Sequence, residues 1–139
     1  MISFLKKIYF VDDDPIFTFI SKKLMKEEQF GASLIGFEHG KEAIEALLEC
    51  DEKDNLLPTV IFLDISMPVM NGWEFLDSFQ AAPINNKEKI KIVVMSSSIN
   101  PLEIGMIKNY PIVHDYIVKP ITPADLNKIK DCLINEHQA

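Results

Sequence analysis

The sequence predicts a doubly wound α/β domain built on a five-stranded parallel sheet, and three observations support this prediction. Five short apolar runs alternate along the chain with segments whose apolar residues recur at helical spacing. The central run, residues 60–63, is continuously apolar, as in a strand that is buried on both faces of a parallel sheet. Most runs end in polar residues. This alternation predicts a sheet with helices on both faces and right-handed crossovers.

The composition is that of one globular domain. A chain of 139 residues buries about 70% of its unfolded surface, so we expect a single domain, residues 1–139, with a core at about 7–136. The formal charge of −7 argues against direct binding to nucleic acid, which needs clustered Lys and Arg. No apolar run approaches the roughly 20 residues of a membrane span, and no signal peptide is recognisable. We therefore expect a cytoplasmic protein that does not bind membranes.

The first strand is predicted at residues 8–11, directly before an acidic helix start. Asp14 suits the helix N-cap, and Pro15 suits the first helical position. Asp12 and Asp13 have no task in this helix start beyond a favourable interaction with its dipole. The inner face of the helix is predicted to carry Phe17, Ile20 and Leu24.

The next segments lead to the central strand. Gly31 suits a helix C-cap, and residues 33–37 follow as a second strand. Residues 40–49 have apolar side chains at helical spacing and are predicted as a helix. A charged loop and Pro58 then precede the central strand, which ends at Asp64.

The second half repeats the alternation of helix and strand. Gly72 opens a helix that stops near Pro83, and its inner face is predicted to carry Trp73, Leu76 and Phe79. Residues 85–88 are a polar loop, and residues 90–95 form a fourth strand that ends in a run of three serines.

The last elements are a short helix, a strand and a long helix. Asn100 is predicted to cap a helix that reaches Asn109. Residues 112–118 form the fifth strand, which is followed by Lys119 and Pro120. The final helix begins near residue 122 and is predicted to bury Leu126, Ile129, Leu133 and Ile134.

Polar side chains are expected to gather where the parallel strands end. Asp12, Asp13, Asp64, Ser96 and Lys119 all follow or close predicted strands, and the carboxyl ends of parallel strands share one edge of the sheet. Three neighbouring carboxylates repel one another, and a hard cation such as Mg²⁺ relieves that repulsion. A lysine ammonium and a serine hydroxyl would complete a cradle for a phosphoryl group.

Five motifs in this order resemble a known family, the receiver domains of two-component response regulators. The resemblance covers essentially the whole chain and is closest to stand-alone receivers of the chemotaxis type. It implies a flavodoxin-like sheet with strand order 2-1-3-4-5, flanked by five helices, in a signalling domain that is not an enzyme. The motifs are Val11-Asp12-Asp13, Asp64-Ile65-Ser66-Met67-Pro68 with Met70-Asn71-Gly72, Ser96, Tyr116, and Lys119-Pro120.

The resemblance implies a phosphoacceptor and a metal site. Asp64 would take a phosphoryl group from a histidine kinase or a histidine phosphotransfer protein as an acyl phosphate. Asp13, Asp64 and the main-chain carbonyl of Ser66 would bind Mg²⁺, and Asp12 would act through a water molecule.

The resemblance also implies a switch. Lys119 would pair with a phosphoryl oxygen, and its peptide bond to Pro120 is expected to be cis. Ser96 would be the switch hydroxyl, and Tyr116 the aromatic side chain that moves inward with it. The changed surface would then bind a downstream protein.

The chain departs from the family at residues 108–111, which lack the Gly-Ala pair that is usual before the fifth strand. We therefore expect the switching surface to be atypical in detail. Ser66 and Ser98 lie at positions where the family tunes dephosphorylation.

Two alternatives remain open on the sequence. A haloacid-dehalogenase-type phosphatase also uses a strand-end aspartate and Mg²⁺, but it needs a second aspartate two residues later, where this chain has Ser66. A degenerate receiver would bind partners without phosphorylation. The complete set of acidic, hydroxyl and lysine residues argues against the degenerate receiver.

Overall fold

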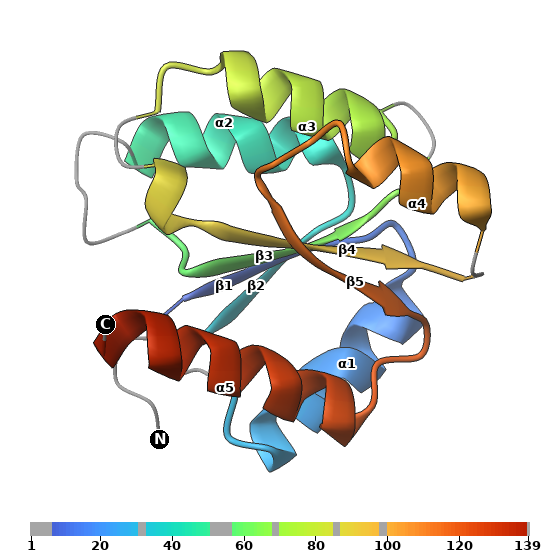
Figure 1. Ribbon diagram of the computed structural model, residues 1–139, viewed down its shortest axis with the longest axis vertical. Helices are drawn as coiled ribbons and strands as arrows, with labels where there is room; N and C mark the ends of the chain where they lie inside the picture. Colours follow the sequence, from blue (N-terminus) through green and yellow to red (C-terminus); the bar gives the residue numbers. More distant parts are fainter. Residues whose placement is uncertain are drawn as a thin grey trace.

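The computed structural model of the chain describes residues 7–30, 33–50, 57–67, 70–84, 87–97 and 100–138. A twisted sheet lies between two layers of helices (Figure 1). The strands are β1 (Ile8–Val11), β2 (Leu34–Phe37), β3 (Val60–Asp64), β4 (Lys91–Ser96) and β5 (Val113–Val118). The α-helices are α1 (Pro15–Glu27), α2 (Gly40–Cys50), α3 (Gly72–Ala81), α4 (Pro101–Ile107) and α5 (Pro123–Gln138), and a 3₁₀ turn, η2 (Lys87–Lys89), precedes β4.

The five strands form one parallel sheet in the order β2-β1-β3-β4-β5. The predicted fold class, a five-stranded flavodoxin-like sheet with five α-helices, is therefore confirmed. Every residue of β1 and β3 is buried, which explains why β1 is apolar throughout and β3 is apolar up to its last residue, Asp64. Because all strands run in the same direction, polar residues that follow different strands meet at one edge of the sheet.

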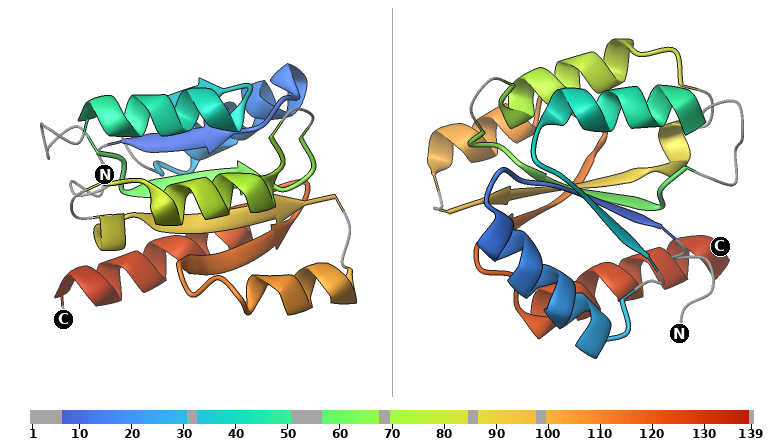
Figure 2. Two further views of the ribbon diagram at one scale, coloured as in Figure 1. Left: turned by 90° about the horizontal axis from the view of Figure 1, so that it is seen from above. Right: turned by 180° about the vertical axis from the view of Figure 1, so that it is seen from behind.

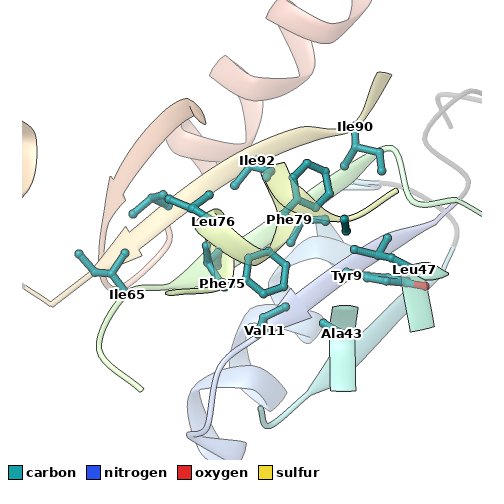
Figure 3. Close-up of a cluster of buried hydrophobic side chains, with 14 of the residues drawn as sticks. Tyr9, Val11, Ala43, Leu47, Ile65, Phe75, Leu76, Phe79, Ile90 and Ile92 are labelled. Atoms are coloured by element: carbon teal, nitrogen blue, oxygen red, sulfur yellow. The ribbon is translucent and has the colours of Figure 1, made fainter. Parts of the chain in front are cut away.

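Each face of the sheet carries its own hydrophobic core. Helices α2 and α3 cover one face, and α1 and α5 cover the other (Figure 2). In the first core, Phe75, Leu76 and Phe79 of α3 pack with Tyr9 of β1 and Leu47 of α2 (Figure 3). The second core includes Phe10, Met25, Phe62, Leu126 and Ile129.

Helix α1 begins as predicted, and two of the three predicted inner residues, Phe17 and Leu24, pack against the second core. The Asp14 side chain caps the helix by accepting two N–H groups of its first turn, and Pro15 is the first helical residue. The prediction that Ile20 faces the core is wrong, because Ile20 is 57% exposed. The buried positions are Ser21 and Met25. Apolar residues surround more than one side of this helix, so helical spacing alone does not identify the buried face.

The remaining elements lie within a few residues of their predicted bounds. Helix α4 ends at Ile107 rather than Asn109, and Lys87 and Glu88, which were predicted to lie in a loop, form part of the η2 turn. The predictions for Gly31, for the charged loop at 51–55, for Pro68, for residues 85 and 86, and for Ser98 fall outside the described residues. Within the described part of the chain, no helix combines the length and hydrophobicity that crossing a bilayer requires.

Candidate functional site

Three carboxylates meet at the carboxyl edge of the sheet. Asp12 and Asp13 follow β1, and Asp64 ends β3. The pairing of Val11 with Leu63 sets Asp12 and Asp64 level with each other on adjacent strands. One carboxylate oxygen from each of the three acids lies within 4.8 Å of the other two. Asp12 is only 2% exposed and Asp64 only 3%, so two of these charges are largely removed from water.

Backbone amides orient both buried carboxylates. The N–H of Asp14 donates to Asp12 Oδ1 at 2.8 Å, and the N–H of Ser66 donates to Asp64 Oδ1 at 3.1 Å. In each case the donor lies two residues after the acid, which is the geometry of an Asx turn. The turn that ends each strand therefore also holds its carboxylate in place.

A glycine allows the loop after Asp64 to lie against helix α3. The N–H of Gly72 donates to the carbonyl of Ile65 at 3.2 Å. A Cβ atom at Gly72 would lie 2.6 Å from the Cα atom of Ile65, a backbone contact too short for any side chain. This close approach ties the strand end that carries Asp64 to the start of α3.

Lys119 bridges two of the three carboxylates. Its Nζ lies 2.7 Å from Asp12 Oδ2 and 3.4 Å from Asp64 Oδ2. The ammonium also lies 4.5 Å from the centroid of the Phe17 ring, within the range of a cation–π contact. The Lys119–Pro120 peptide bond is cis, as expected from the resemblance.

Burial and neighbouring charges shift the pKa values of Asp64 and Lys119. Burial raises the pKa of Asp64 to about 6, and the nearby Asp12 charge adds to this effect, while the Ser66 N–H and Lys119 oppose it. Burial by itself lowers the pKa of Lys119, but the hydrogen bond that its ammonium donates to Asp12 and the charges of both acids outweigh burial, so that the pKa of Lys119 is raised overall. Lys119 therefore stays charged, while Asp64 takes up a proton more readily than an ordinary aspartate does.

The three acids form a donor set that fits a divalent cation. Mg²⁺ prefers hard oxygen ligands and is commonly held by one or two carboxylates together with water. Asp12, Asp13 and Asp64 supply oxygens of this kind within one small volume. The Ser66 main-chain carbonyl remains a predicted ligand, and the Ser66 side chain is exposed.

The predicted switch hydroxyl has a partner that the sequence did not reveal. Ser96 is the last residue of β4, and its side chain is buried. Its Oγ donates a hydrogen bond to Glu103 Oε1 at 3.0 Å. Glu103 lies in the first turn of α4. The only sequence signal for Glu103 was the Asn-x-x-Glu pattern from Asn100, which indicates a helix start and not a contact with β4.

Tyr116 lies on the neighbouring strand, on the same face of the sheet as Ser96. Tyr116 of β5 pairs with Val94, while Ser96 pairs with Val118. Since residues two apart point to the same face of a strand, Ser96 and Tyr116 share the face that α2, α3 and α4 cover. Tyr116 is half-buried and packs against the first hydrophobic core.

The segment that departs from the family pattern is anchored to α3. Tyr110, which follows α4, stacks on Trp73 with ring centroids 5.8 Å apart. Its hydroxyl donates to Asp77 Oδ1 at 2.9 Å. Two side chains of α3 thus hold the connection between α4 and β5. Trp73 was predicted as a core residue, and its stacking on a loop tyrosine could not be foreseen from helical spacing.

Comparisons with known proteins agree with this architecture. A family model described as the response regulator receiver domain matches residues 8–130. The crystal structure of a two-component response regulator from Cytophaga hutchinsonii superposes with a TM-score of 0.86 at 27% identity, covering 94% of this chain and 98% of that one.

Two curated relatives extend the comparison. A two-component response regulator of Oryza sativa subsp. japonica is 27% identical over 91% of this chain, which spans 54% of that protein. A hybrid signal transduction histidine kinase of Dictyostelium discoideum is 30% identical over 93% of this chain, which spans 10% of that protein. The chain thus covers about half of the first relative and a small part of the second.

Proposed function

Because the chain belongs to the response regulator receiver domain family, we propose that it is a phosphorylation-controlled switch in which Asp64 is the phosphoacceptor. Receiver domains are signalling domains of two-component systems and are generally not enzymes. We propose residues 1–139 as a single such domain that acts in the cytoplasm. The observation that supports this proposal most strongly is that Lys119 bridges Asp12 and Asp64 within a cluster of three carboxylates.

The transfer step makes one bond to phosphorus and breaks another. An ionised oxygen of Asp64 attacks the phosphorus of the donor, the bond from phosphorus to the donor atom breaks, and its electron pair leaves with the donor. A pKa of about 6 leaves Asp64 mostly ionised at pH 7 and above. Lys119 then pairs with an oxygen of the transferred group, as it pairs here with a carboxylate oxygen.

We propose Mg²⁺ as the cofactor of this step. Asp13, Asp64 and the main-chain carbonyl of Ser66 would hold it directly, with Asp12 acting through a water molecule. When bound, Mg²⁺ supplies positive charge that offsets the carboxylates and the phosphoryl oxygens. The clustering of three acidic side chains supports this assignment.

The response to phosphorylation is a change on the face that Ser96 and Tyr116 share. The Ser96 hydroxyl would turn to a phosphoryl oxygen, and Tyr116 would move inward behind it. A bistable element of this kind responds only if the phosphoryl group interacts differently with its two states. A downstream protein would recognise the altered surface around α4, β5 and α5.

The phosphodonor is proposed to be a histidine kinase or a histidine phosphotransfer protein that docks beside the acidic cluster. Helix α1 exposes Ile16, Phe19 and Ile20. A groove of about 260 Å³ borders this helix and is lined by Asp12, Phe19 and Phe37 among others. An apolar surface next to Asp12 is a suitable contact for a protein that presents a phosphohistidine.

Intact mass spectrometry tests the phosphoacceptor. The chain, Asp64→Asn and the control Asp131→Asn, an exposed acid on α5, are each incubated with Mg²⁺ and acetyl phosphate. We expect one hydroxylamine-labile phosphoryl adduct on the chain and on the control, and none on Asp64→Asn. An adduct that survives in Asp64→Asn would contradict the assignment, and release of phosphate from a generic phosphate ester would favour a phosphatase.

A further inference from the structure

We propose that Glu103 is a positioning residue that holds the Ser96 hydroxyl away from the phosphoacceptor until Asp64 is phosphorylated. This inference rests on the proposed function and assigns a new role to one side chain of α4. Glu103 touches neither Asp64 nor a transferred group, so it acts through Ser96. In this role it sets how readily the switch responds to a phosphoryl group.

The contact is short and links the end of a strand to the start of a helix. Ser96 Oγ donates to Glu103 Oε1 at 3.0 Å, and the Ser96 side chain is buried. Ser96 ends β4, whereas α4 begins at Pro101. The hydrogen bond therefore links the end of β4 to the first turn of α4, between residues that are seven positions apart in the sequence. Hydrogen bonds to an ionised acceptor are stronger than neutral ones.

The chemistry of a hydroxyl makes the two states exclusive. A serine hydroxyl has one proton to donate. While that proton is given to Glu103, it cannot be given to a phosphoryl oxygen on Asp64. Activation through Ser96 must therefore break the bond to Glu103, and the strength of this bond adds directly to the cost of the active state.

Apart from its Asn100 cap, the first turn of helix α4 has no buried residue that would hold it in place. None of its seven residues is buried, and Leu102, Ile104 and Met106 are exposed. The anchor of Tyr110 on Trp73 lies beyond the other end of the helix. Release of Glu103 would therefore free the beginning of α4 while its end stays attached to α3.

A titration with beryllofluoride, a non-covalent phosphoryl mimic, measures this cost. In the presence of Mg²⁺, calorimetry gives the apparent dissociation constant for the chain, Glu103→Ala and Glu103→Gln. If the responsive state is a minor population, its stabilisation lowers the apparent constant. We expect Glu103→Ala to bind about five- to tenfold more tightly, as the loss of a charge-assisted hydrogen bond implies. Glu103→Gln keeps an acceptor oxygen and should fall between the two.

Two controls separate the hydrogen bond from general effects. Glu74→Ala removes the glutamate at the same helical position of α3, where it caps its own helix, and should leave the constant unchanged. In a Ser96→Ala background, Glu103→Ala should have no further effect, because the hydroxyl that links the two is gone. Equal constants for the chain and Glu103→Ala would overturn the proposal. An effect of Glu103→Ala that persists without the Ser96 hydroxyl would also overturn it.

These experiments also distinguish a failure of the proposed phosphorylation switch from a failure of the role proposed for Glu103. If the native chain binds no beryllofluoride and forms no adduct with acetyl phosphate, the phosphorylation switch itself is wrong, and the role of Glu103 is overturned with it. If the native chain binds the mimic but the Glu103 variants do not differ from it, only the role of Glu103 is wrong.

Discussion

Helices α3 and α4 begin with the same sequence pattern but use it differently. Each starts with Asn-x-x-Glu, from Asn71 to Glu74 in α3 and from Asn100 to Glu103 in α4. In α3 both side chains close a capping box on their own helix. In α4 the asparagine caps the helix, while the glutamate accepts a hydrogen bond from Ser96 of β4. The same local motif thus stabilises one helix and ties the other to a neighbouring strand.

The two helices also differ in how much of them is buried. Helix α3 buries Phe75, Leu76 and Phe79 in the first core. Helix α4 buries no residue, and its Leu102 is 78% exposed. Burial of apolar surface holds α3 in place, whereas α4 packs the half-buried Ile107 of its last turn against the same core. This difference suits α3 to support the acidic site and α4 to change position.

The largest difference between the two helices is expected when one apolar side chain in each helix is truncated. Phe75→Ala should lower the free energy of unfolding by about 3–5 kcal/mol, because it leaves a cavity in the core. Leu102→Ala should change it by less than about 0.5 kcal/mol, because that side chain is exposed. Urea unfolding monitored by circular dichroism measures both. Similar losses for the two variants would show that α4 is packed as firmly as α3.

Replacing the glycine of each helix with alanine should change the stability of the fold in opposite directions. Gly72→Ala should destabilise the fold by about 1–3 kcal/mol, because its Cβ would collide with the backbone of Ile65. Gly105→Ala should stabilise it by about 0.5–1 kcal/mol, since alanine favours the helix and nothing lies within 4 Å of the new methyl group. Thermal unfolding of the two variants beside the native chain decides the signs.

The acidic site beside α3 should carry an electrostatic cost that varies with pH. The folded pKa of Asp64 is raised from 3.8 to about 6, so the folded state binds the proton more tightly than the unfolded state. Without metal, the contribution of Asp64 to stability should fall as pH rises from about 4 to about 6 and then level off. Asp64→Asn removes that cost and should stabilise the chain by about 1–2 kcal/mol at pH 7.5.

Urea unfolding in EDTA at pH 4 and pH 7.5 checks this prediction, with Asp131→Asn as the control. The gain in unfolding free energy of Asp64→Asn over the native chain should be small at pH 4 and should reach its full value at pH 7.5. An advantage that is equal at both pH values would mean that burial of the Asp64 charge is not its source.

A small effect is expected at the link between the two helices. Tyr110→Phe keeps the ring that stacks on Trp73 and removes the hydroxyl that donates to Asp77. This hydrogen bond is exposed, so its loss should cost only about 0.5–1 kcal/mol. Trp73 is the only tryptophan in the chain, and its fluorescence during urea unfolding reports the change directly. A loss as large as that of Phe75→Ala would place this link in the core.

The fold could be predicted because its strands are buried in a parallel sheet. The apolar runs that became β1 and β3 are buried at every position, so their sequence carries a strong signal. The buried face of α1 was predicted less well. Ile20 was expected inside, yet the buried position next to it is Ser21, a small polar residue that hydrophobic spacing does not detect.

The candidate site could be predicted where topology alone brings residues together. Asp12, Asp64 and Lys119 follow strands, and the parallel sheet places such residues at one edge. The roles of Glu103 and Tyr110 could not be predicted in this way. Their partners depend on how α4 sits against β4 and α3, and no local pattern in the sequence encodes that position.

Amide hydrogen exchange is the most direct test of the claim that the acidic site controls α4 and leaves α3 in place. The chain and Asp64→Asn are compared with and without Mg²⁺ and beryllofluoride, and exchange is read by mass spectrometry. We predict that exchange in residues 100–107 changes when the mimic binds the native chain, that residues 72–81 keep their protection, and that Asp64→Asn shows no change. Unaltered exchange in α4 with the mimic bound, or an equally large change in α3, would contradict the account.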